Sequence, residues 1–268
     1  MAAKLNISLS EWVDQKQSTG RYYFTRDQAA TELELCVGSF KKAAGRLSAK
    51  KRIVRVHSGF YVIVPLEYTS AGIIPADWFI ADFMAHLKQP FYVGLLTAAA
   101  YYGASHQRSQ KYHVVTNKPI REIRCRTVVI SFFKKNDLAS AAIEQIKTTT
   151  GYVPVSSPET TALDLLRYVR RVGGISSILT VFQELGEKLD SAKLVAAAKN
   201  EGDLAYIQRL GWLLDETAFG NKTGPLADWI KQQNPPPIKL YPSLPKKGFE
   251  RNRRWNLWIN TDVQGDLT

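Results

Sequence analysis

The chain has 268 residues, of which 45% are hydrophobic, and its formal net charge at pH 7 is +12. This hydrophobic content excludes a chain that is disordered throughout, and the length allows one large domain or two ordinary ones. An excess of positive charge favours a nucleic acid, an anionic membrane face or an acidic protein as partner, although a basic surface kept for solubility gives the same total. The two distant cysteines predict neither a disulfide framework nor a zinc site.

The amino-terminal residues predict three helices. Ser8 or Ser10 can cap the first helix, and an aromatic strand follows at residues 22–24. Thr25 begins the second helix, because a glutamine three residues later gives the spacing of a capping box. We expect a tight break at residues 37–38 and a third helix capped by Ser39.

The third helix and the segment after it predict a winged helix-turn-helix. Residues 53–56 and 60–64 alternate as two strands, with a turn at residues 57–59, so a β-hairpin follows the helix directly. The helix carries apolar residues at i, i+3, i+4 and i+7, the spacing of a buried helical face: Phe40, Ala43, Ala44 and Leu47.

The charge on this segment is one-sided, since seven Lys or Arg and no Asp or Glu lie between Gly38 and Ser58. A helix in the major groove has phosphates on both sides, and cations there release condensed counterions. We therefore predict contacts to phosphates or base edges from the helix, phosphate clamps after it, and groove or backbone contacts from the wing. A solvated helix face is the alternative for any single lysine. The predicted DNA-binding residues are Ser39, Lys41, Lys42, Arg46, Lys50, Lys51, Arg52, Arg55 and His57.

The strand pattern is lost after residue 64, so we place a boundary near residue 70, with domains at 1–70 and 71–268. The predicted class is α+β: an N-terminal winged helix-turn-helix followed by a larger mixed α/β domain with a helical second half. Its predicted helices cover residues 75–87, 91–103, 158–169, 175–186, 191–199, 203–215 and 225–232. Its predicted strands cover residues 111–116, 127–133, 152–155 and the tail 253–259.

The second domain carries no recognisable catalytic motif. The four histidines have no metal-ligand spacing, and no phosphate-binding glycine loop is present. We therefore expect no enzyme activity, no cofactor and no metal. The alternative is a metal-dependent DNA-processing enzyme that uses Glu159 and Asp164, although a first-turn acid at a helix start explains Glu159 more simply.

A possible secondary basic patch lies in the second domain. It could extend a nucleic-acid footprint, meet an acidic protein, or be solvated surface, and aromatic neighbours are typical of the first of these. One cluster consists of Lys118, Arg121, Arg124 and Arg126. The other consists of Lys246, Lys247, Arg251, Arg253 and Arg254.

Several blocks of the sequence, in this order, resemble the AbiEi family of bacterial abortive-infection toxin–antitoxin systems. They are FYVGLLTAAAYYGASHQ at 91–107, VVT at 114–116, VSSPETTALDLLRYVRRVGGI at 155–175, IQRLGWLLD at 207–215 and RRWNLWIN at 253–260. The resemblance implies an antitoxin and transcriptional regulator whose winged helix binds inverted repeats in its own promoter and represses the operon. It also implies a C-terminal domain that counteracts a nucleotidyltransferase-like toxin, with direct binding left open, and it supplies no catalytic residues.

No apolar run approaches the roughly 20 residues of a membrane span, and no signal peptide is recognisable. We therefore expect a cytoplasmic protein without a membrane partner. An RNA-binding or purely protein-binding adaptor is a third interpretation, and competition between duplex DNA and RNA would separate it from a DNA-binding regulator.

Overall fold

The computed structural model describes residues 7–104, 110–261 and 263, and it has the mixed α+β composition predicted from the sequence. The last three residues of the block at 91–107 lie outside the described residues. The chain divides into two units by its internal contacts. The first unit holds residues 1–91, 110–136 and 145–154, and the second unit holds residues 92–109, 137–144 and 155–268. The domain boundary near residue 70 stays a prediction.

Residues 7–63 form three helices and a three-stranded sheet of order β1-β3-β2, in which β3 pairs antiparallel with both neighbours. The elements are α1 (Leu9–Ser18), β1 (Tyr23–Thr25), α2 (Arg26–Glu32), α3 (Val37–Ala49), β2 (Ile53–His57) and β3 (Phe60–Ile63). Ser8 caps α1 in a capping box with Glu11, and the Thr25 hydroxyl accepts a hydrogen bond from the Gln28 N–H at 3.1 Å. The two predicted caps are thus confirmed.

The start of α3 corrects the sequence-based prediction. The helix begins at Val37, after Cys36 as N-cap, and the Phe40 N–H donates to the Cys36 carbonyl at 2.9 Å. Ser39 is therefore not the cap but the third helical residue. The break predicted at residues 37–38 is wrong, because both residues are helical. A glycine costs a helix only about 1 kcal/mol, so neighbouring packing can keep it helical.

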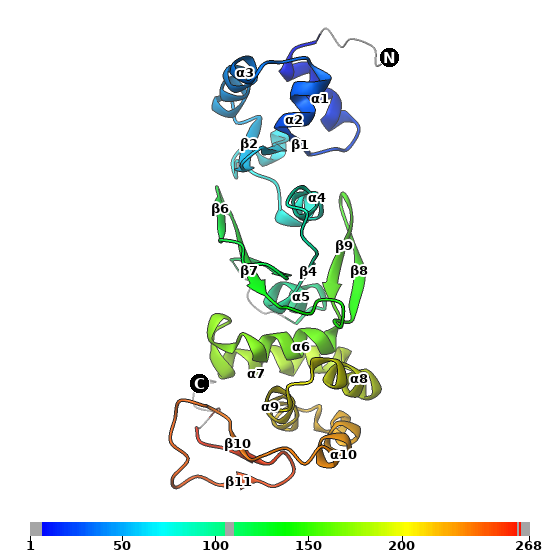
Figure 1. Cartoon of the computed structure of the whole chain (residues 1–268), viewed down its shortest axis with the longest axis vertical. Coiled ribbons are helices and arrows are strands. Elements are labelled where there is room, and N and C mark those ends of the chain that lie inside the picture. Colours follow the sequence, from blue (N-terminus) through cyan, green and yellow to red (C-terminus); the bar gives the residue numbers. More distant parts are fainter. Residues whose placement is uncertain (1–6, 105–109, 262, 264–268) are drawn as a thin grey trace. The chain divides into compact units, whose positions relative to one another are not determined.

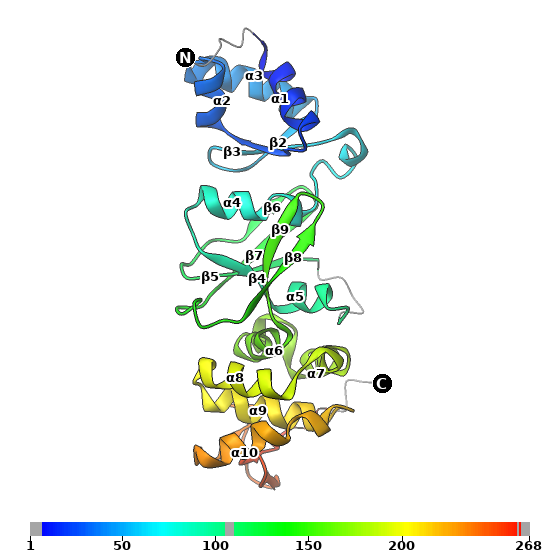
Figure 2. The same ribbon diagram turned by 90° about the vertical axis from the view of Figure 1, so that its right-hand side faces the viewer.

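The helices pack on the sheet through an aromatic and aliphatic core. Figures 1 and 2 show the three helices on one side of the β1–β3 strands. Trp12 meets Phe24 edge to face at 5.3 Å between ring centroids, and Phe24 stacks on Tyr61 at 5.3 Å. Phe40 and Leu47 bring α3 into the same cluster.

The remainder of the first unit contains a short helix and further strands. Its elements are η1 (Leu66–Tyr68), η2 (Ala76–Trp78), α4 (Ile80–His86), β5 (Tyr112–Thr116), β6 (Ile123–Cys125) and β7 (Val128–Lys134). The strand order is β6-β7-β5, with β6 antiparallel and β5 parallel to β7. β8 (Ile143–Thr148) and β9 (Gly151–Ser156) are neighbouring strands whose residues are divided between the units. The helix predicted at 75–87 is thus a 3-10 turn followed by α4.

The second unit is mainly helical. It contains α5 (Leu95–Tyr101), α6 (Pro158–Arg167), α7 (Gly174–Leu185), α8 (Ser191–Glu201), α9 (Leu204–Asp215) and α10 (Gly224–Gln232), with 3-10 turns η3 (Val169–Arg171), η4 (Gly186–Lys188) and η5 (Gly220–Lys222). The segment predicted as one helix at 91–103 instead opens with strand β4 (Phe91–Val93), which pairs in parallel with β9 at Val93 and Val155.

Helix α6 is the centre of this helical part. Residues 158–166 are all buried, and α6 contacts α5, α7, α8 and α9 (Figures 1 and 2). Ser157 caps it, as predicted, by accepting the Thr160 N–H at 3.2 Å. The tail adds a small sheet of order β10-β12-β11, with strands β10 (Ile238–Lys239), β11 (Arg251–Asn252) and β12 (Leu257–Trp258).

Candidate nucleic-acid interface

Helix α3 has one buried and one charged face. Phe40, Ala44 and Leu47 are buried in the core, whereas Lys41, Lys42 and Arg46 are exposed. The helical period produces this division, because residues i, i+4 and i+7 share one face and residues i+1, i+2 and i+6 turn away from it. The cations therefore lie on the solvent-exposed face of the helix, away from the core.

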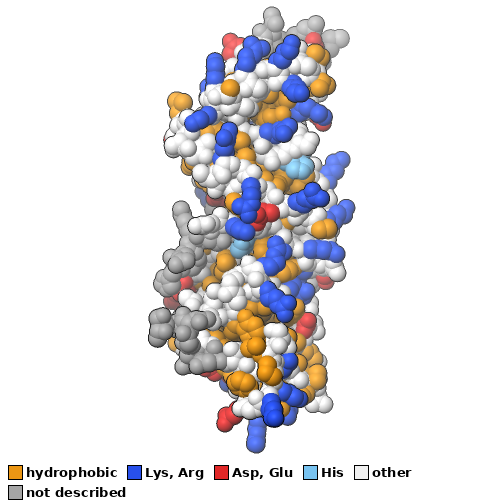
Figure 3. Space-filling view, turned by 90° about the vertical axis from the view of Figure 1, so that its left-hand side faces the viewer, with side chains coloured by type: hydrophobic (Ala, Val, Ile, Leu, Met, Phe, Trp, Pro, Cys, Tyr) orange, Lys and Arg blue, Asp and Glu red, His pale blue; other side chains and the backbone are white. Residues whose placement is uncertain are grey.

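The cations of α3, of the following turn and of β2 are exposed and close together in the sequence. Figure 3 shows Lys and Arg side chains over the face where α3 and β2 lie. Within residues 7–104, 110–261 and 263, no ion pair joins any of six exposed cations to a carboxylate: Lys41, Lys42, Arg46, Lys50, Lys51 and Arg55. Their charge is therefore available to an anionic partner.

Arg52 differs from these six residues. Its guanidinium pairs with the Asp14 carboxylate of α1, and 30% of its side chain is exposed. The pair joins the turn after α3 to α1. It also neutralises one of the charges predicted to clamp a phosphate.

The tip of the β2–β3 hairpin packs on α4. Gly59 completes the two-residue turn with φ +74°, a value that favours glycine, and its carbonyl accepts the Arg26 N–H at 2.8 Å. The His57 ring meets Phe83 at 5.8 Å between centroids, and His86 Nε2 lies 3.3 Å from the Ser58 carbonyl. His57 is exposed, yet one side of the tip is occupied by α4.

The first basic cluster of the secondary patch lies in the same unit as α3. Lys118, Arg121, Arg124 and Arg126 are exposed, and β6 contacts β2: the Cys125 thiol points at the Arg55 carbonyl at 3.8 Å. Arg124 pairs with Glu122. A hydrogen bond from Ser131, followed by one from Lys111, lowers the pKa of Glu122 to about 2.

The second basic cluster lies in the tail of the second unit, where its side chains are exposed but partly engaged. Arg254 pairs with Asp215 at 3.1 Å, and Arg251 donates to the Asn256 side-chain oxygen. Lys246 lies 5.6 Å from the centre of the Trp258 ring. Lys247 and Arg253 are also exposed.

The carboxylates of the alternative enzymatic reading are both buried and have separate partners. Glu159 accepts the Asp190 N–H at 3.0 Å, and Asp164 accepts the Tyr92 hydroxyl at 2.6 Å. Among the described residues no group of three His, Cys, Asp or Glu could hold a metal ion. These bonds connect α6 to the start of α8 and to β4.

Sequence reasoning missed the first turn of α3. Val37 is 72% exposed at the first helical position, next to the cations. A hydrogen bond with the Ser39 hydroxyl at 3.2 Å lowers the pKa of the exposed Cys36 thiol. The available signal was a large apolar residue at the start of an otherwise basic helix, but the adjacent Gly38 was interpreted as a break.

A family model matches the central part of the chain. Residues 92–216, just under half of the chain, match the family model described as AbiEi antitoxin C-terminal domain. This match confirms the resemblance to the AbiEi family, and it supports an antitoxin role in a toxin–antitoxin system.

A solved structure shares the fold. The crystal structure of the RV2827C protein from Mycobacterium tuberculosis is similar with a TM-score of 0.65 and 13% sequence identity, over 93% of this chain and 90% of that chain. No curated protein matches the sequence. In the described part of the chain, no helix is both long enough and apolar enough to cross a membrane.

Proposed function

We propose that the protein is a DNA-binding repressor of its own operon and an antitoxin that counteracts a nucleotidyltransferase-like toxin. In this proposal residues 1–70 act as a winged helix-turn-helix, with α3 as the recognition helix and the β2–β3 hairpin as the wing. The observation that carries the proposal is the exposed face of α3, where Lys41, Lys42 and Arg46 have no carboxylate partner among the described residues.

The unpaired positive charge of this face favours duplex DNA as its partner. Unpaired cations on one helix repel each other and gain most from a surface of regularly spaced negative charge, which duplex DNA supplies. The amino-terminal residues of a recognition helix contact base edges, while cations along the helix and hairpin contact phosphates. The first basic cluster, on and near β6, would add phosphate contacts beside β2.

The proposed operator is an inverted repeat in the chain's own promoter, which two copies of the protein would bind. The antitoxin part of the proposal rests on the family match at residues 92–216. Repression and antitoxicity then use different parts of the chain, and substitutions on α3 should remove the first without the second.

The test is a gel shift and footprint on the DNA upstream of the protein's own gene, with scrambled duplex DNA and RNA of the same length as competitors. The wild-type chain should protect a specific site. A variant with Lys41→Ala, Lys42→Ala and Arg46→Ala should lose this protection, because each lost phosphate contact weakens binding.

A second triple variant serves as the matched control. Lys193, Lys199 and Lys231 are exposed in the second unit. Their replacement by alanine also removes three positive charges, but none from α3. This control should bind the operator like the wild-type chain. Equal loss of binding in both triple variants, or normal binding by the α3 variant, contradicts the proposal.

Antitoxicity is tested separately, by co-expression with the nucleotidyltransferase-like gene next to the protein's own gene. The α3 variant should rescue growth as well as the wild-type chain does. Absence of such a neighbouring gene, or of any rescue by the wild-type chain, would contradict the antitoxin part alone.

A further inference from the structure

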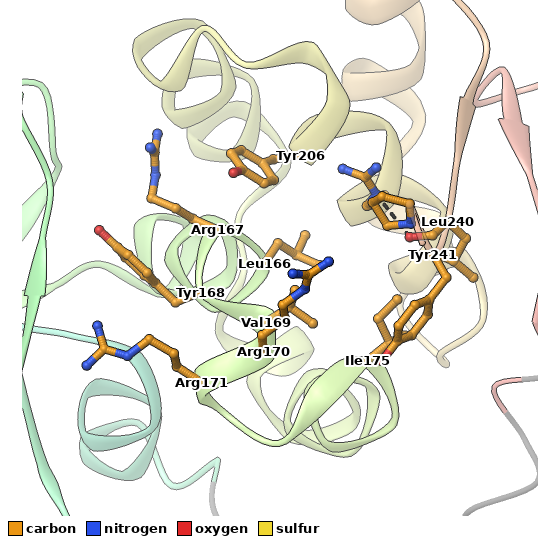
Figure 4. A pocket seen from close by; sticks show the side chains of 12 residues that line it. Leu166, Arg167, Tyr168, Val169, Arg170, Arg171, Ile175, Tyr206, Leu240 and Tyr241 are labelled. Carbon is orange, nitrogen blue, oxygen red and sulfur yellow. Dashed lines mark hydrogen bonds between the residues drawn. The ribbon is translucent and has the colours of Figure 1, made fainter. Parts of the chain in front are cut away.

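A pocket of about 430 Å³ lies within the second unit, between the end of α6 with η3, helix α9 and residues 240–242 (Figure 4). Its apolar floor is formed by Leu166, Ile175 and Leu240. Figure 4 shows Arg170 in the middle of the lining residues, with Tyr168 on one side and Tyr241 on the other.

The walls of the pocket are held in place by hydrogen bonds. Arg209 of α9 donates to the Lys239 carbonyl at 2.9 Å and to the Leu240 carbonyl at 3.1 Å, which fixes the tail segment against α9. Asn260 accepts the Tyr241 N–H and donates to the Tyr241 carbonyl, both at 2.9 Å. The backbone that presents the Tyr241 ring is therefore positioned before any ligand arrives.

The pocket is positively charged. Four arginines line it, at positions 167, 170, 171 and 209, and none of its lining residues is Asp or Glu. Glu201, outside the lining, pairs with Arg167. The buried Nε–H of Arg167 has no acceptor among the described residues. Arg170 is exposed, and its guanidinium has no ion-pair partner among the described residues, so the pocket favours a ligand that carries negative charge.

Three tyrosines also line the pocket, on different sides of it (Figure 4). The Arg167 guanidinium lies over the Tyr206 ring, 5.4 Å from the ring centre. The other two tyrosines are Tyr168 and Tyr241. Burial, followed by the Asp164 carboxylate, raises the pKa of Tyr168 to about 12, so at neutral pH its phenol is uncharged. Tyrosine rings with apolar side chains below them suit a flat aromatic ligand, which can stack on them.

The size of the pocket favours a small molecule over a macromolecule. Pockets for small ligands have volumes of about 300–1,000 Å³, whereas a protein partner usually needs about 800 Å² of surface on each side. We propose that this pocket binds a nucleoside phosphate, with the phosphate at Arg170 and the base stacked on the Tyr241 ring over the apolar floor.

The test is isothermal titration calorimetry on the full chain with AMP, GMP, CMP and UMP. At least one should bind with a Kd below about 1 mM, which is ordinary for a small ligand held by one charged group and one stacked ring. Adenosine has the base without the phosphate, and inorganic phosphate lacks the base. Each should bind at least roughly tenfold more weakly than the nucleotide.

Two variants locate the site. Arg170→Ala and Tyr241→Leu should each weaken nucleotide binding about tenfold, because a charge-assisted hydrogen bond or a stacked base is lost. If one of them fails to fold in a thermal melt, the other still decides the question. Arg253→Ala, an exposed arginine outside the pocket, should bind the nucleotide normally.

The triple α3 variant distinguishes the pocket from the proposed DNA surface, and it should keep its nucleotide affinity while losing operator DNA. The proposal is overturned if none of the four nucleotides binds at a concentration of about 10 mM, which is roughly tenfold above the highest Kd expected. Wild-type affinity in the folded pocket variants also overturns it, as does equal affinity for inorganic phosphate and nucleotide.

Discussion

Single side chains on α3 follow the helical period closely enough that the sequence alone placed most of them correctly. The buried positions of Phe40 and Leu47 and the exposure of Lys41 follow from spacing. The pairing of Arg52 with Asp14 could not be predicted, because it depends on how α1 crosses the end of α3. The cap at Cys36 was also missed, since cysteine is not among the preferred capping residues.

Val37 should contribute sequence specificity to DNA binding. An exposed apolar side chain in the first turn of a recognition helix can contact the methyl group of a thymine. Replacing the contacted thymine by deoxyuridine removes that methyl group and should cost about 0.8 kcal/mol, or roughly fourfold in affinity. Fluorescence anisotropy on operator duplexes with one deoxyuridine at each position measures this effect.

The matched variant for this experiment is Val37→Ser, which keeps a small side chain but lacks the apolar surface. It should bind thymine and deoxyuridine operators equally well. A wild-type chain that is insensitive at every position, or a variant that keeps the wild-type sensitivity, would exclude Val37 from this contact.

At the scale of elements, a buried ring is one of the contacts that hold the carboxy-terminal tail to α9. Trp255 donates its indole N–H to Asp215 at 2.7 Å, and the ring lies over Gly211, where an added Cβ would stand 2.2 Å from ring atoms. Residues 207–215 and 253–260 are therefore packed together. Their contact could not be derived from either block alone.

Gly211→Ala should destabilise the fold by about 1–3 kcal/mol, because a buried ring must shift to admit the methyl group. Gly45→Ala is the matched control: Gly45 is helical, and an added Cβ there meets no atom within 4 Å. This control should gain up to about 1 kcal/mol from helix propensity. Urea unfolding of the two variants measures both changes, and similar stability in both would contradict the packing argument.

Glu122 joins the edge strand β6 to β7 and should make stability depend on pH. Its pKa is lowered from the ordinary 4.5 to about 2, so its stabilising bonds are fully present above pH 4.5 and are lost as the pH falls through 2. Glu122→Gln should therefore lower the free energy of unfolding at pH 7 by up to about 1 kcal/mol, the size expected for a surface cluster.

The difference between wild type and Glu122→Gln should shrink as the pH is lowered from 4.5 towards 2, and thermal melts across this range measure it. Glu67→Gln serves as control, since Glu67 is exposed and joins no ion pair within the described residues. A constant difference at every pH would mean that the Glu122 carboxylate charge plays no part.

The elements that the sequence predicted best are helices with clear end signals. Helices α6, α8 and α9 each follow a residue whose side chain caps the helix, namely Ser157, Asp190 and Asp203, so the local sequence suffices. Strands β4 and β6 have three residues each, and β8 alternates between exposed and half-buried residues, so neither length nor hydrophobicity identifies them. Their position depends on neighbouring strands from distant parts of the chain.

At the scale of the whole molecule, the cations differ in whether a carboxylate neutralises them. The cations of α3 and β2 have no carboxylate partners among the described residues, whereas several of the others, such as Arg124 and Arg254, are paired. The total of +12 in the sequence could not reveal this difference. The pocket lined by Arg170 was not predicted either, because its arginines and tyrosines come from three separate segments.

The salt dependence of operator binding tests the central claim most directly. For B-DNA the slope of log K against log salt concentration is about −0.9 for each phosphate contacted, so alanine at Lys41, Lys42 and Arg46 should reduce its magnitude by up to about 2.7. The control with alanine at 193, 199 and 231 should keep the wild-type slope. A common slope for all three proteins would show that α3 does not meet the phosphates, and would contradict the account.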